Sequence, residues 1–448
     1  MKSRQIAIIG LLVGLIFVIA TMPAESQQGA QASVTFNKHV LPILQKNCQT
    51  CHRPGEIAPM SFLTYKDARP WARAIKNAVV NRQMPPWFAD PGYGHFANDR
   101  RLSDAEIQTL SKWADDGAVE GDPKDMAPPR TFQDGWNIKP DMIIEMPKDF
   151  NVPASGTVSY QNILVKVNFP EDRWVVAAEM RAGNKQVLHH GRVLVRRPGM
   201  TFMKDAIPGE AYETGSLAMT KEDAPDTLGK FNPGLGPQDF SLYESAKFIP
   251  KGSDLVFNMH YTAVGKAATD RSRVGLVFAK DPPKRRYFMH NGPTGSNLAI
   301  PPREGNAEIV SEMTTNVDAR LVYVQPHMHL RGKDYELRVV LPSGKSETVF
   351  KAKWDFNWQI GYDLAKPIDL PKGTRIIGLA HYDNSANNKF NPDPNKLVLW
   401  GDQNWEEMQN CFLGILIDPK IEPKAVFSPS GPSLLPRGES GPTFASLR

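Results

Sequence analysis

The sequence predicts a multidomain protein in which a small all-α domain is followed by two all-β sandwich domains of jelly-roll-like architecture. The chain has 448 residues, which is more than one hydrophobic core usually serves, so two or three domains are expected. Helical patterns are confined to about residues 36–118. Beyond Trp136, short β-rich runs alternate with Pro/Gly turns, as is typical of sandwiches.

The N-terminus predicts export from the cytoplasm. Positive charge in "MKSRQ" precedes an apolar run from Ile6 to Met22, and small polar residues follow. This order is typical of a secretory signal peptide over residues 1–32, with Ala30–Ala32 as a cleavage site. The alternative is an uncleaved anchor, because the apolar run is at the short end of what spans a bilayer. We therefore expect a periplasmic or otherwise exported protein, with a membrane as partner only if the segment stays uncleaved.

Residues 33–121 form the predicted helical domain. In "LSDAEIQTLSKWADDGA", Ser103 stands three residues before Glu106, which is a capping box, and Gly117 is a stop signal. Residues 122–136 are rich in Pro, Gly and charged residues and are expected to be a linker.

The β-rich remainder is long enough for two sandwiches. Runs such as "RVLVRR", "DLVFNMHYTAV" and "YELRVVLP" continue to about residue 427. We place the two sandwich domains at residues 137–296 and 297–427, divided near a Gly/Pro-rich stretch. Residues 428–448 are rich in Pro, Gly and Ser and are expected to be a disordered tail.

Composition excludes some functions and favours none. The net charge is +5 without a long basic run, so nothing argues for a nucleic-acid partner. The chain has three cysteines, and two of them fall in one short motif. Cys411 then has no partner, and an exported protein of this kind is not a disulfide scaffold.

The short motif is "CQTCH", which is the attachment pattern of a c-type haem. Cys48 and Cys51 would form the two thioether bonds, and His52 would ligate the iron. A redox dithiol and half of a zinc site are the alternatives. The first is disfavoured because no βαβ pattern surrounds the motif, and the second because a structural zinc site needs four ligands.

The sixth haem ligand is predicted to be Met84, which follows a helix in "NRQMPPW". Met60 is the competing methionine, and His39 and His95 are remoter alternatives. A thioether ligand raises the haem potential relative to a second histidine. The stretch from "FNKHVLPILQKNCQTCH" to "WADDGA" resembles a bacterial class I-type cytochrome c domain.

Histidines of the β region form a second pattern. His327 and His329 flank Met328, and on a strand both rings would share one face, as metal ligands require. His189 and His190 are adjacent and would point to opposite faces, so they can bind one metal only at a bulge or a strand end. Gly191 is consistent with such a bulge. His260, taken alone, is more simply a core or surface histidine.

The order and spacing of these residues are similar to those of metal ligands in a known protein family. The pair "HH" is followed about 70 residues later by His260, then by "HMH" about 67 further on, and by "WEEM" with Met408 about 79 beyond. This series resembles the copper type II, ascorbate-dependent monooxygenase family, over roughly residues 137–427. In that family two β-sandwich domains each carry one copper.

The resemblance implies two copper sites. The electron-storing copper would be held by three histidines: His189, His190 and His260. The copper that meets dioxygen and substrate would be held by His327, His329 and Met408. A thioether favours Cu(I), the form that binds dioxygen, and Met328 would point away into packing. The chain departs from the family in having no disulfides, and in Phe412 where the peptide-amidating member has a substrate-binding tyrosine.

Together the two motifs predict an exported oxidoreductase with one covalent haem c and two coppers. It would be a dioxygen-dependent monooxygenase that hydroxylates an unknown small-molecule or peptide substrate. Electrons would come through the haem domain from a periplasmic donor or an ascorbate-like reductant. The alternatives are a periplasmic electron-transfer or copper-binding protein without hydroxylase activity, and a metal-free module that binds a partner.

Overall fold

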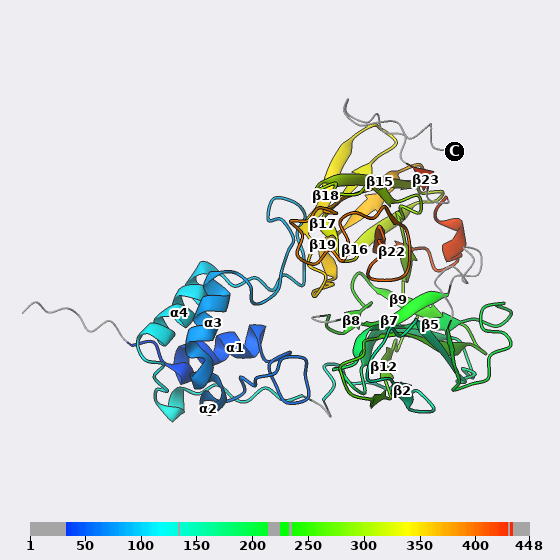
Figure 1. The fold of residues 1–448 in the computed structure, drawn as a ribbon. Coiled ribbons are helices and arrows are strands. Elements are labelled where there is room, and N and C mark those ends of the chain that lie inside the picture. Colours follow the sequence, from blue (N-terminus) through cyan, green and yellow to red (C-terminus); the bar gives the residue numbers. More distant parts are fainter. Residues whose placement is uncertain (1–32, 133–134, 214–224, 233–234, 429–430, 433–448) are drawn as a thin grey trace, which may run out of the picture.

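The computed structural model describes residues 33–132, 135–213, 225–232, 235–428 and 431–432. The predicted signal segment and nearly all of the predicted tail lie outside these residues. Most of the regular secondary structure in the described chain is β-sheet, consistent with the predicted sandwiches (Figure 1). Within the described ranges, no helix is long and apolar enough to cross a membrane.

A nine-stranded sheet is the common wall of both sandwiches. Its order is β1-β12-β4-β9-β13-β22-β16-β19, and β8 pairs with β4. The strands are β1 (Met142–Glu145), β4 (Arg173–Arg181), β8 (Gln238–Asp239), β9 (Ser245–Ile249), β12 (Arg273–Phe278), β13 (Arg285–Asn291), β16 (Ala319–His327), β19 (Tyr362–Leu370) and β22 (Asn410–Ile417). The halves join where β13 pairs antiparallel with β22, and β13 ends just before the predicted division at residue 296.

The first sandwich packs a five-stranded sheet against the N-terminal half of this wall. Its order is β6-β3-β10-β5-β7. The strands are β3 (Gln161–Val165), β5 (Leu188–Arg196), β6 (Ala211–Glu213), β7 (Asp226–Phe231) and β10 (Asp254–Tyr261). Strand β10 is buried along its whole length. Together with β5, it fills the core between the sheets with residues such as Val193 and Phe257.

The second sandwich repeats this arrangement with the sheet β18-β17-β20-β15-β23. The strands are β15 (Ala307–Thr314), β17 (Gly332–Val340), β18 (Ser346–Lys353), β20 (Arg375–Tyr382) and β23 (Gly431–Pro432). Strand β17 alternates, so that Tyr335, Leu337 and Val339 face the core. Two small sheets complete the β region: β2 (Phe150–Val152) with β11 (Ala268–Asp270), and β14 (Ala299–Ile300) with β21 (Val398–Leu399).

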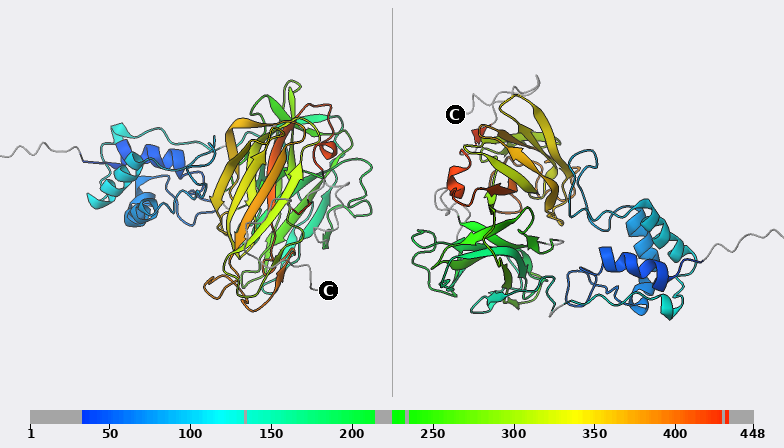
Figure 2. Two further views of the ribbon diagram at one scale, coloured as in Figure 1. Left: turned by 90° about the horizontal axis from the view of Figure 1, so that it is seen from above. Right: turned by 180° about the vertical axis from the view of Figure 1, so that it is seen from behind.

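The N-terminal region is helical and has a core of its own. Its elements are η1 (Phe36–Val40), α1 (Leu41–Asn47), α2 (Tyr65–Ala68), η2 (Arg69–Trp71), α3 (Ala72–Val80), α4 (Asp104–Asp115) and η3 (Pro123–Asp125). Leu44, Leu110 and Trp113 are fully buried there. The capping box of Ser103 and Glu106 is present at the start of α4, as predicted. Figure 2 shows this region beside the sandwiches.

The helical region is joined to the second sandwich by residues 87–98, which we call the strap. The strap forms β-bridges from Ala89 to Ala352 and from Phe96 to Leu364. Trp87 belongs to the core of the second sandwich, and the Phe96 ring packs on the same core. Trp87, Phe88 and Phe96 of the strap thus pack against the second sandwich, although they lie within the predicted domain of residues 33–121.

Candidate functional site

Strands β5 and β10 bring the first histidine set together: His189, His190 and His260. His260 pairs with His190, whereas the next residue, Tyr261, pairs with Leu188. The register shift leaves His189 as the extra residue of a β-bulge, which confirms the bulge expected beside Gly191. A Cβ on Gly191 would lie 2.7 Å from the Met180 Cε atom of the opposite sheet, so a larger residue here would require the end of the Met180 side chain to move.

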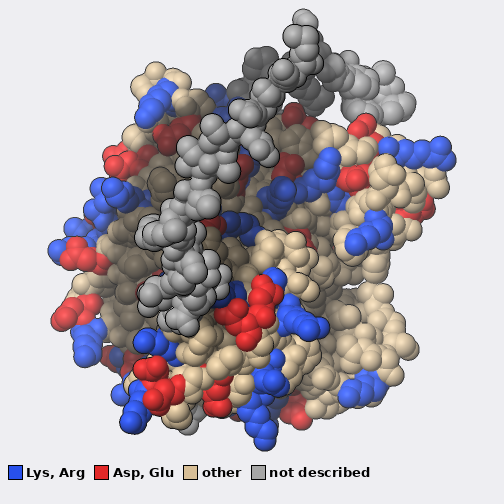
Figure 3. Space-filling view, turned by 90° about the vertical axis from the view of Figure 1, so that its left-hand side faces the viewer, with Lys and Arg blue, Asp and Glu red and all other residues tan. Residues whose placement is uncertain are grey.

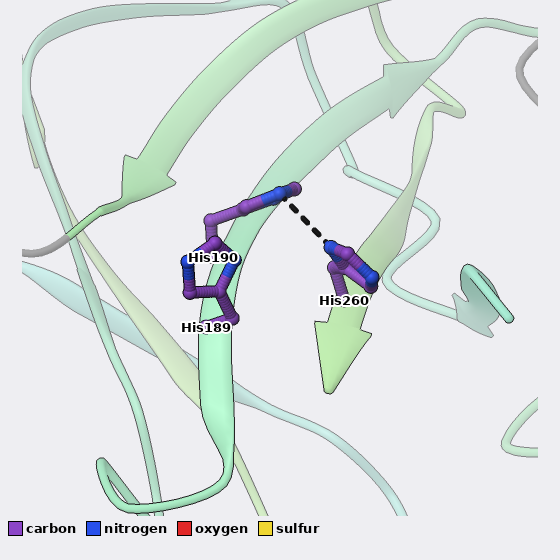
Figure 4. A group of neighbouring side chains, drawn as sticks. All are labelled: His189, His190 and His260. Carbon is purple, nitrogen blue, oxygen red and sulfur yellow. Dashed lines mark hydrogen bonds between the residues drawn. The ribbon is translucent and has the colours of Figure 1, made fainter. Parts of the chain in front are cut away.

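One nitrogen atom from each ring of the first set lies within 4.8 Å of the others. His190 Nε2 and His260 Nδ1 are 3.1 Å apart, and Figure 4 shows the rings of the two strands pointing toward one another. The Nδ1 atom of His189 is buried without a hydrogen-bond partner among the described residues. A buried imidazole nitrogen without a partner, next to two more, has the donor set of a metal site.

The environment keeps the first set neutral. Burial lowers the pKa of His260 to about 4, and neighbouring histidines add to the effect. Burial, with the charge of His260, also lowers the pKa of His190 well below its usual range. Neutral imidazole is the form that binds a metal, so these rings need lose no proton when a metal enters.

The second set comprises His327, His329 and Met408. His327 is the last residue of β16, His329 lies just beyond it, and their ring centroids are 5.3 Å apart. Met328 between them is fully buried in the hydrophobic core, as predicted. Burial lowers the pKa of His327 to about 4 and that of His329 well below its usual range.

Backbone and side-chain partners orient both rings of the second set. His327 Nδ1 lies 2.9 Å from Gln359 Oε1, and His329 Nδ1 lies 3.3 Å from the backbone oxygen of Glu406. Both partners are acceptors, so each Nδ1 carries its proton and each Nε2 keeps a free lone pair. Glu407 is fully buried and accepts backbone N–H groups from His329 and Arg331 at 2.8 and 2.6 Å.

Met408 approaches from the segment before β22. Strand pairing places Asn410 opposite His327. Met408 is 5% exposed, and its sulfur accepts a hydrogen bond of 3.5 Å from Asn410 Nδ2. Met408, Asn410 and His327 all line one cavity. The structure therefore places Met408 and His327 on the same cavity, with His329 next to His327.

The two sets are neighbours across the junction of the sandwiches. The ring centroids of His190 and His327 are 6.2 Å apart. Both rings line a cavity of about 710 Å³. The cavity also contains the buried cation Lys230, whose Nζ donates to Gln325 Oε1 at 2.8 Å and lies 3.7 Å from the centroid of the Phe412 ring.

The "CQTCH" motif lies after α1 in the helical region. Cys48 and Cys51 are both free, and the His52 ring stacks on Phe62 with centroids 4.3 Å apart. Burial raises the pKa of Cys48 to about 12, and the neighbouring Cys51 thiol adds to the rise. Reactive dithiols have lowered pKa values, so these thiols do not fit a redox pair. His52 Nδ1 is buried without a hydrogen-bond partner in the described chain.

The sixth-ligand candidates occupy different places. Met84 is half-buried beyond the end of α3, and no hydrogen bond or ring contact of the described residues links it to His52. Met60 and Cys48 both pack against the helical core. His39 Nδ1 accepts the backbone N–H of Thr35 at 3.1 Å, and His95 lies exposed on the strap. The assignment to Met84 stays a prediction.

The loop after the motif touches the first sandwich through an ion cluster that we call the docking contact: Arg53, Glu56, Arg181 and Lys185. Glu56 is 2.6 Å from Arg181, 2.7 Å from Lys185 and 3.0 Å from Arg53. Burial opposes ionisation of Glu56, but hydrogen bonds from Lys185 and Arg181 hold its pKa below the usual value. Lys185 stands four residues before His189 in the chain.

Sequence reasoning did not identify several residues around the histidines. Tyr160 stacks on His260 with centroids 4.5 Å apart, and its hydroxyl lies 3.3 Å from His190 Nε2. Gln359 and Phe356 come from a loop about 100 residues beyond His260, and Lys230 comes from β7. No local motif marks them, because their importance arises only when the two sandwiches are assembled.

Comparisons with known proteins do not identify the chain. No protein-family model and no curated protein matches it. Among solved structures, the major capsid protein P2 from bacteriophage PM2 aligns over 61% of this chain and 97% of its own, with 10% identity and a TM-score of 0.25. The infectious bursal disease virus VP2 subviral particle aligns over 64% and 75%, with 10% identity and a TM-score of 0.19. Likeness this weak carries no functional argument.

Proposed function

We propose that this chain is an exported haem- and copper-containing oxidoreductase that uses dioxygen to hydroxylate a substrate. The observation that carries the proposal is that two neighbouring histidine sets meet at one cavity, which is lined by His190 of the first set and by His327 and Met408 of the second. The first set offers only imidazole nitrogens, whereas the second adds a thioether. This difference suits one copper that stores an electron and one that meets dioxygen as Cu(I).

Bound copper would supply the redox chemistry and the activation of dioxygen. The protein residues would hold and orient the reacting groups. The Gln359 and Glu406 oxygens would keep the His327 and His329 rings turned so that each Nε2 points to the metal. Burial would keep water away from the second set and would keep its histidines unprotonated.

The cavity has room for a substrate and polar groups to orient it. Asn410 Oδ1 is buried without a hydrogen-bond partner in the described chain, and it lies in the cavity with Met408. Lys230 provides a hydrogen-bond donor next to the Phe412 ring. Burial lowers the pKa of Lys230 well below its usual range. A substrate with a donor and an acceptor could therefore be fixed beside the second set.

A haem attached at Cys48 and Cys51, with His52 as an iron ligand, would pass electrons from a periplasmic donor or an ascorbate-like reductant to the copper region. The unpaired His52 Nδ1 and the two protonated thiols are compatible with such attachment. The docking contact supports delivery within one chain, because it fixes the loop after His52 against the segment that leads to His189.

Metal analysis of the exported protein tests the proposal, with wild type compared with His327→Ala. We expect about two coppers per haem in the wild type and about one in the variant. Reductant-driven dioxygen uptake with a hydroxylated product, across a broad substrate panel, should be lost in the variant. Copper bound without such coupling would favour an electron-transfer or copper-binding protein. Unchanged copper in the variant would contradict the role given to His327.

A further inference from the structure

The loop from Trp354 to Gly361, which we call the bridging loop, contacts histidines of both sets, and its Trp354 Nε1 donates to the His329 backbone oxygen at 3.0 Å. It belongs to the second sandwich, where it joins β18 to β19. The Phe356 ring stacks on His189 of the first sandwich, with centroids 5.2 Å apart and planes inclined by 28°. Three residues later, Gln359 bonds to His327. One short loop therefore spans the junction at which the two sets meet.

Gln359 is fixed from several sides. Its side chain is buried, and its Oε1 accepts from Asn232 Nδ2 at 3.3 Å as well as facing His327 Nδ1. Its backbone oxygen accepts from Gln325 Nε2 at 2.9 Å. Asn232 follows β7 of the first sandwich, so Gln359 is tied to both halves of the β region. These bonds leave little freedom in the direction of the His327 ring.

The strap holds both ends of the bridging loop. At one end, the Lys353 N–H donates to the Phe88 backbone oxygen at 3.2 Å. At the other end, Asn98 Nδ2 donates to the Gly361 backbone oxygen at 2.9 Å, and Asn98 Oδ1 accepts from the Asp363 N–H at 3.0 Å. The ring of Tyr362, the first residue after the loop, packs against Trp87 and Phe96 of the strap.

We propose that the strap and the bridging loop form a positioning device, through which the N-terminal region sets the orientation of a histidine in each set. Gln359 and Phe356 are its positioning residues. The helical region would then act on the metal sites mechanically, in addition to any part in electron supply. The inference rests on the proposed function only in assuming that the two histidine sets bind copper.

Substitutions at Gln359 and Phe356 test the loop in the full chain, with copper alone as the probe. Gln359→Leu should weaken copper binding at the second set about 10–100-fold, as loss of a partner to a ligating histidine usually does. Gln359→Glu should restore most of the affinity, because a carboxylate also accepts from Nδ1–H. Phe356→Ala should change the Cu(II) electron paramagnetic resonance spectrum of the first set alone. Asn357→Ala is the matched control, since Asn357 is exposed and its side chain bonds only to Asp355 within the loop.

The strap is tested separately by Asn98→Ala and amide hydrogen exchange. We expect faster exchange over residues 354–361, together with weaker copper binding at the second set. Unchanged exchange would overturn the role of the strap, and wild-type affinity and spectra in Gln359→Leu and Phe356→Ala would overturn the role of the loop. If the wild type binds no copper, the proposed function fails, whereas the exchange experiment still decides whether the strap holds the loop.

Discussion

The two histidine sets are built by different means, although they lie side by side. In the first set, the register of two central strands and one bulge are sufficient to bring three rings together. In the second set, two histidines at a strand end meet a methionine from a distant segment. Their orientation depends on a glutamine side chain and a backbone oxygen. The first set is therefore organised by the sheet itself, and the second by loops around it.

This difference has consequences for rigidity. Central strands such as β10 are held by hydrogen bonds along both edges, and such strands open only at a large cost in free energy. Loops are held by fewer bonds, and sites that change ligands or admit a substrate are commonly built on them. A rigid all-imidazole set and an adjustable set with a thioether suit the different tasks proposed for the two coppers.

The largest expected effect is the loss of copper from the first set while the second set keeps its copper. His260→Ala removes the ring that faces His190 Nε2, so we expect one of the two coppers to be lost and the second set to keep its copper. The protein should stay folded, because the sheet hydrogen bonds of β10 use only the backbone. Metal content and circular dichroism measure the two effects.

His381→Ala provides the control for that experiment. His381 is also a strand histidine, but its ring is paired with Asp334 at 2.7 Å, away from both sets. It should retain two coppers. If His260→Ala lost both coppers, the two sets would be one interdependent site and the contrast between them would be wrong.

Met408→Leu is expected to weaken the binding of Cu(I), far more than that of Cu(II), at the second set. Leucine fills a similar volume but has no soft donor, so Cu(I) affinity at the second set should fall at least about tenfold, equivalent to about 1.4 kcal/mol. Cu(II) binding should change much less. Competition with a Cu(I) chelator measures the effect, and Met328→Leu is the matched control because that side chain faces the core. Equal effects of both substitutions would remove Met408 from the ligand set.

Much of the first set was accessible from sequence, because its information is local. "HHG" on a β-rich run requires a bulge for both rings to share a metal, and the register shift at His189 supplies it. The capping box of Ser103 and Glu106 and the inward direction of Met328 could also be predicted from a few neighbouring residues. The strap was not predictable. Trp87 and Phe96 are apolar aromatic residues, and their sequence does not show whether they pack on the helical core or on β19.

The nine-stranded sheet and the bridging loop were not predictable for the same reason. Pairing of β13 with β22 joins residues more than 100 positions apart. Nothing in either strand sequence specifies that partner, because any apolar strand satisfies the same hydrogen bonds. The contact of Gln359 with His327 likewise depends on how the two sandwiches pack together.

Glu56→Gln tests how strongly the docking contact holds the helical region against the first sandwich. It removes the carboxylate that Arg53, Lys185 and Arg181 share and leaves only Arg181 with another carboxylate, Glu179 at 3.0 Å, which should cost about 2 kcal/mol of unfolding free energy near neutral pH. The folded pKa of Glu56 is lowered, so the carboxylate stabilises the fold above about pH 4.5, its unfolded value, and this stability is lost as pH falls through the folded pKa. The difference from wild type should therefore shrink in acid.

Denaturant unfolding at several pH values measures that difference. Glu210→Gln is the control, because its pair with Lys148 is exposed and should contribute about 0.5 kcal/mol or less. Similar small effects for both substitutions would mean that the docking contact does not secure the helical region.

The smallest effect is expected from Tyr160→Phe, which bears on how completely the sheet organises the first set. The phenyl ring can keep the stacking on His260, and only the hydroxyl that lies 3.3 Å from His190 Nε2 is lost. A metal needs the lone pair of that same nitrogen, so the hydroxyl competes with the metal rather than supporting it. Copper affinity at the first set should stay within about threefold of wild type or rise slightly, since one neutral hydrogen bond is worth roughly 1 kcal/mol at most here. A tenfold loss in a copper titration would show that Tyr160, in addition to Phe356, is a positioning residue of the first set.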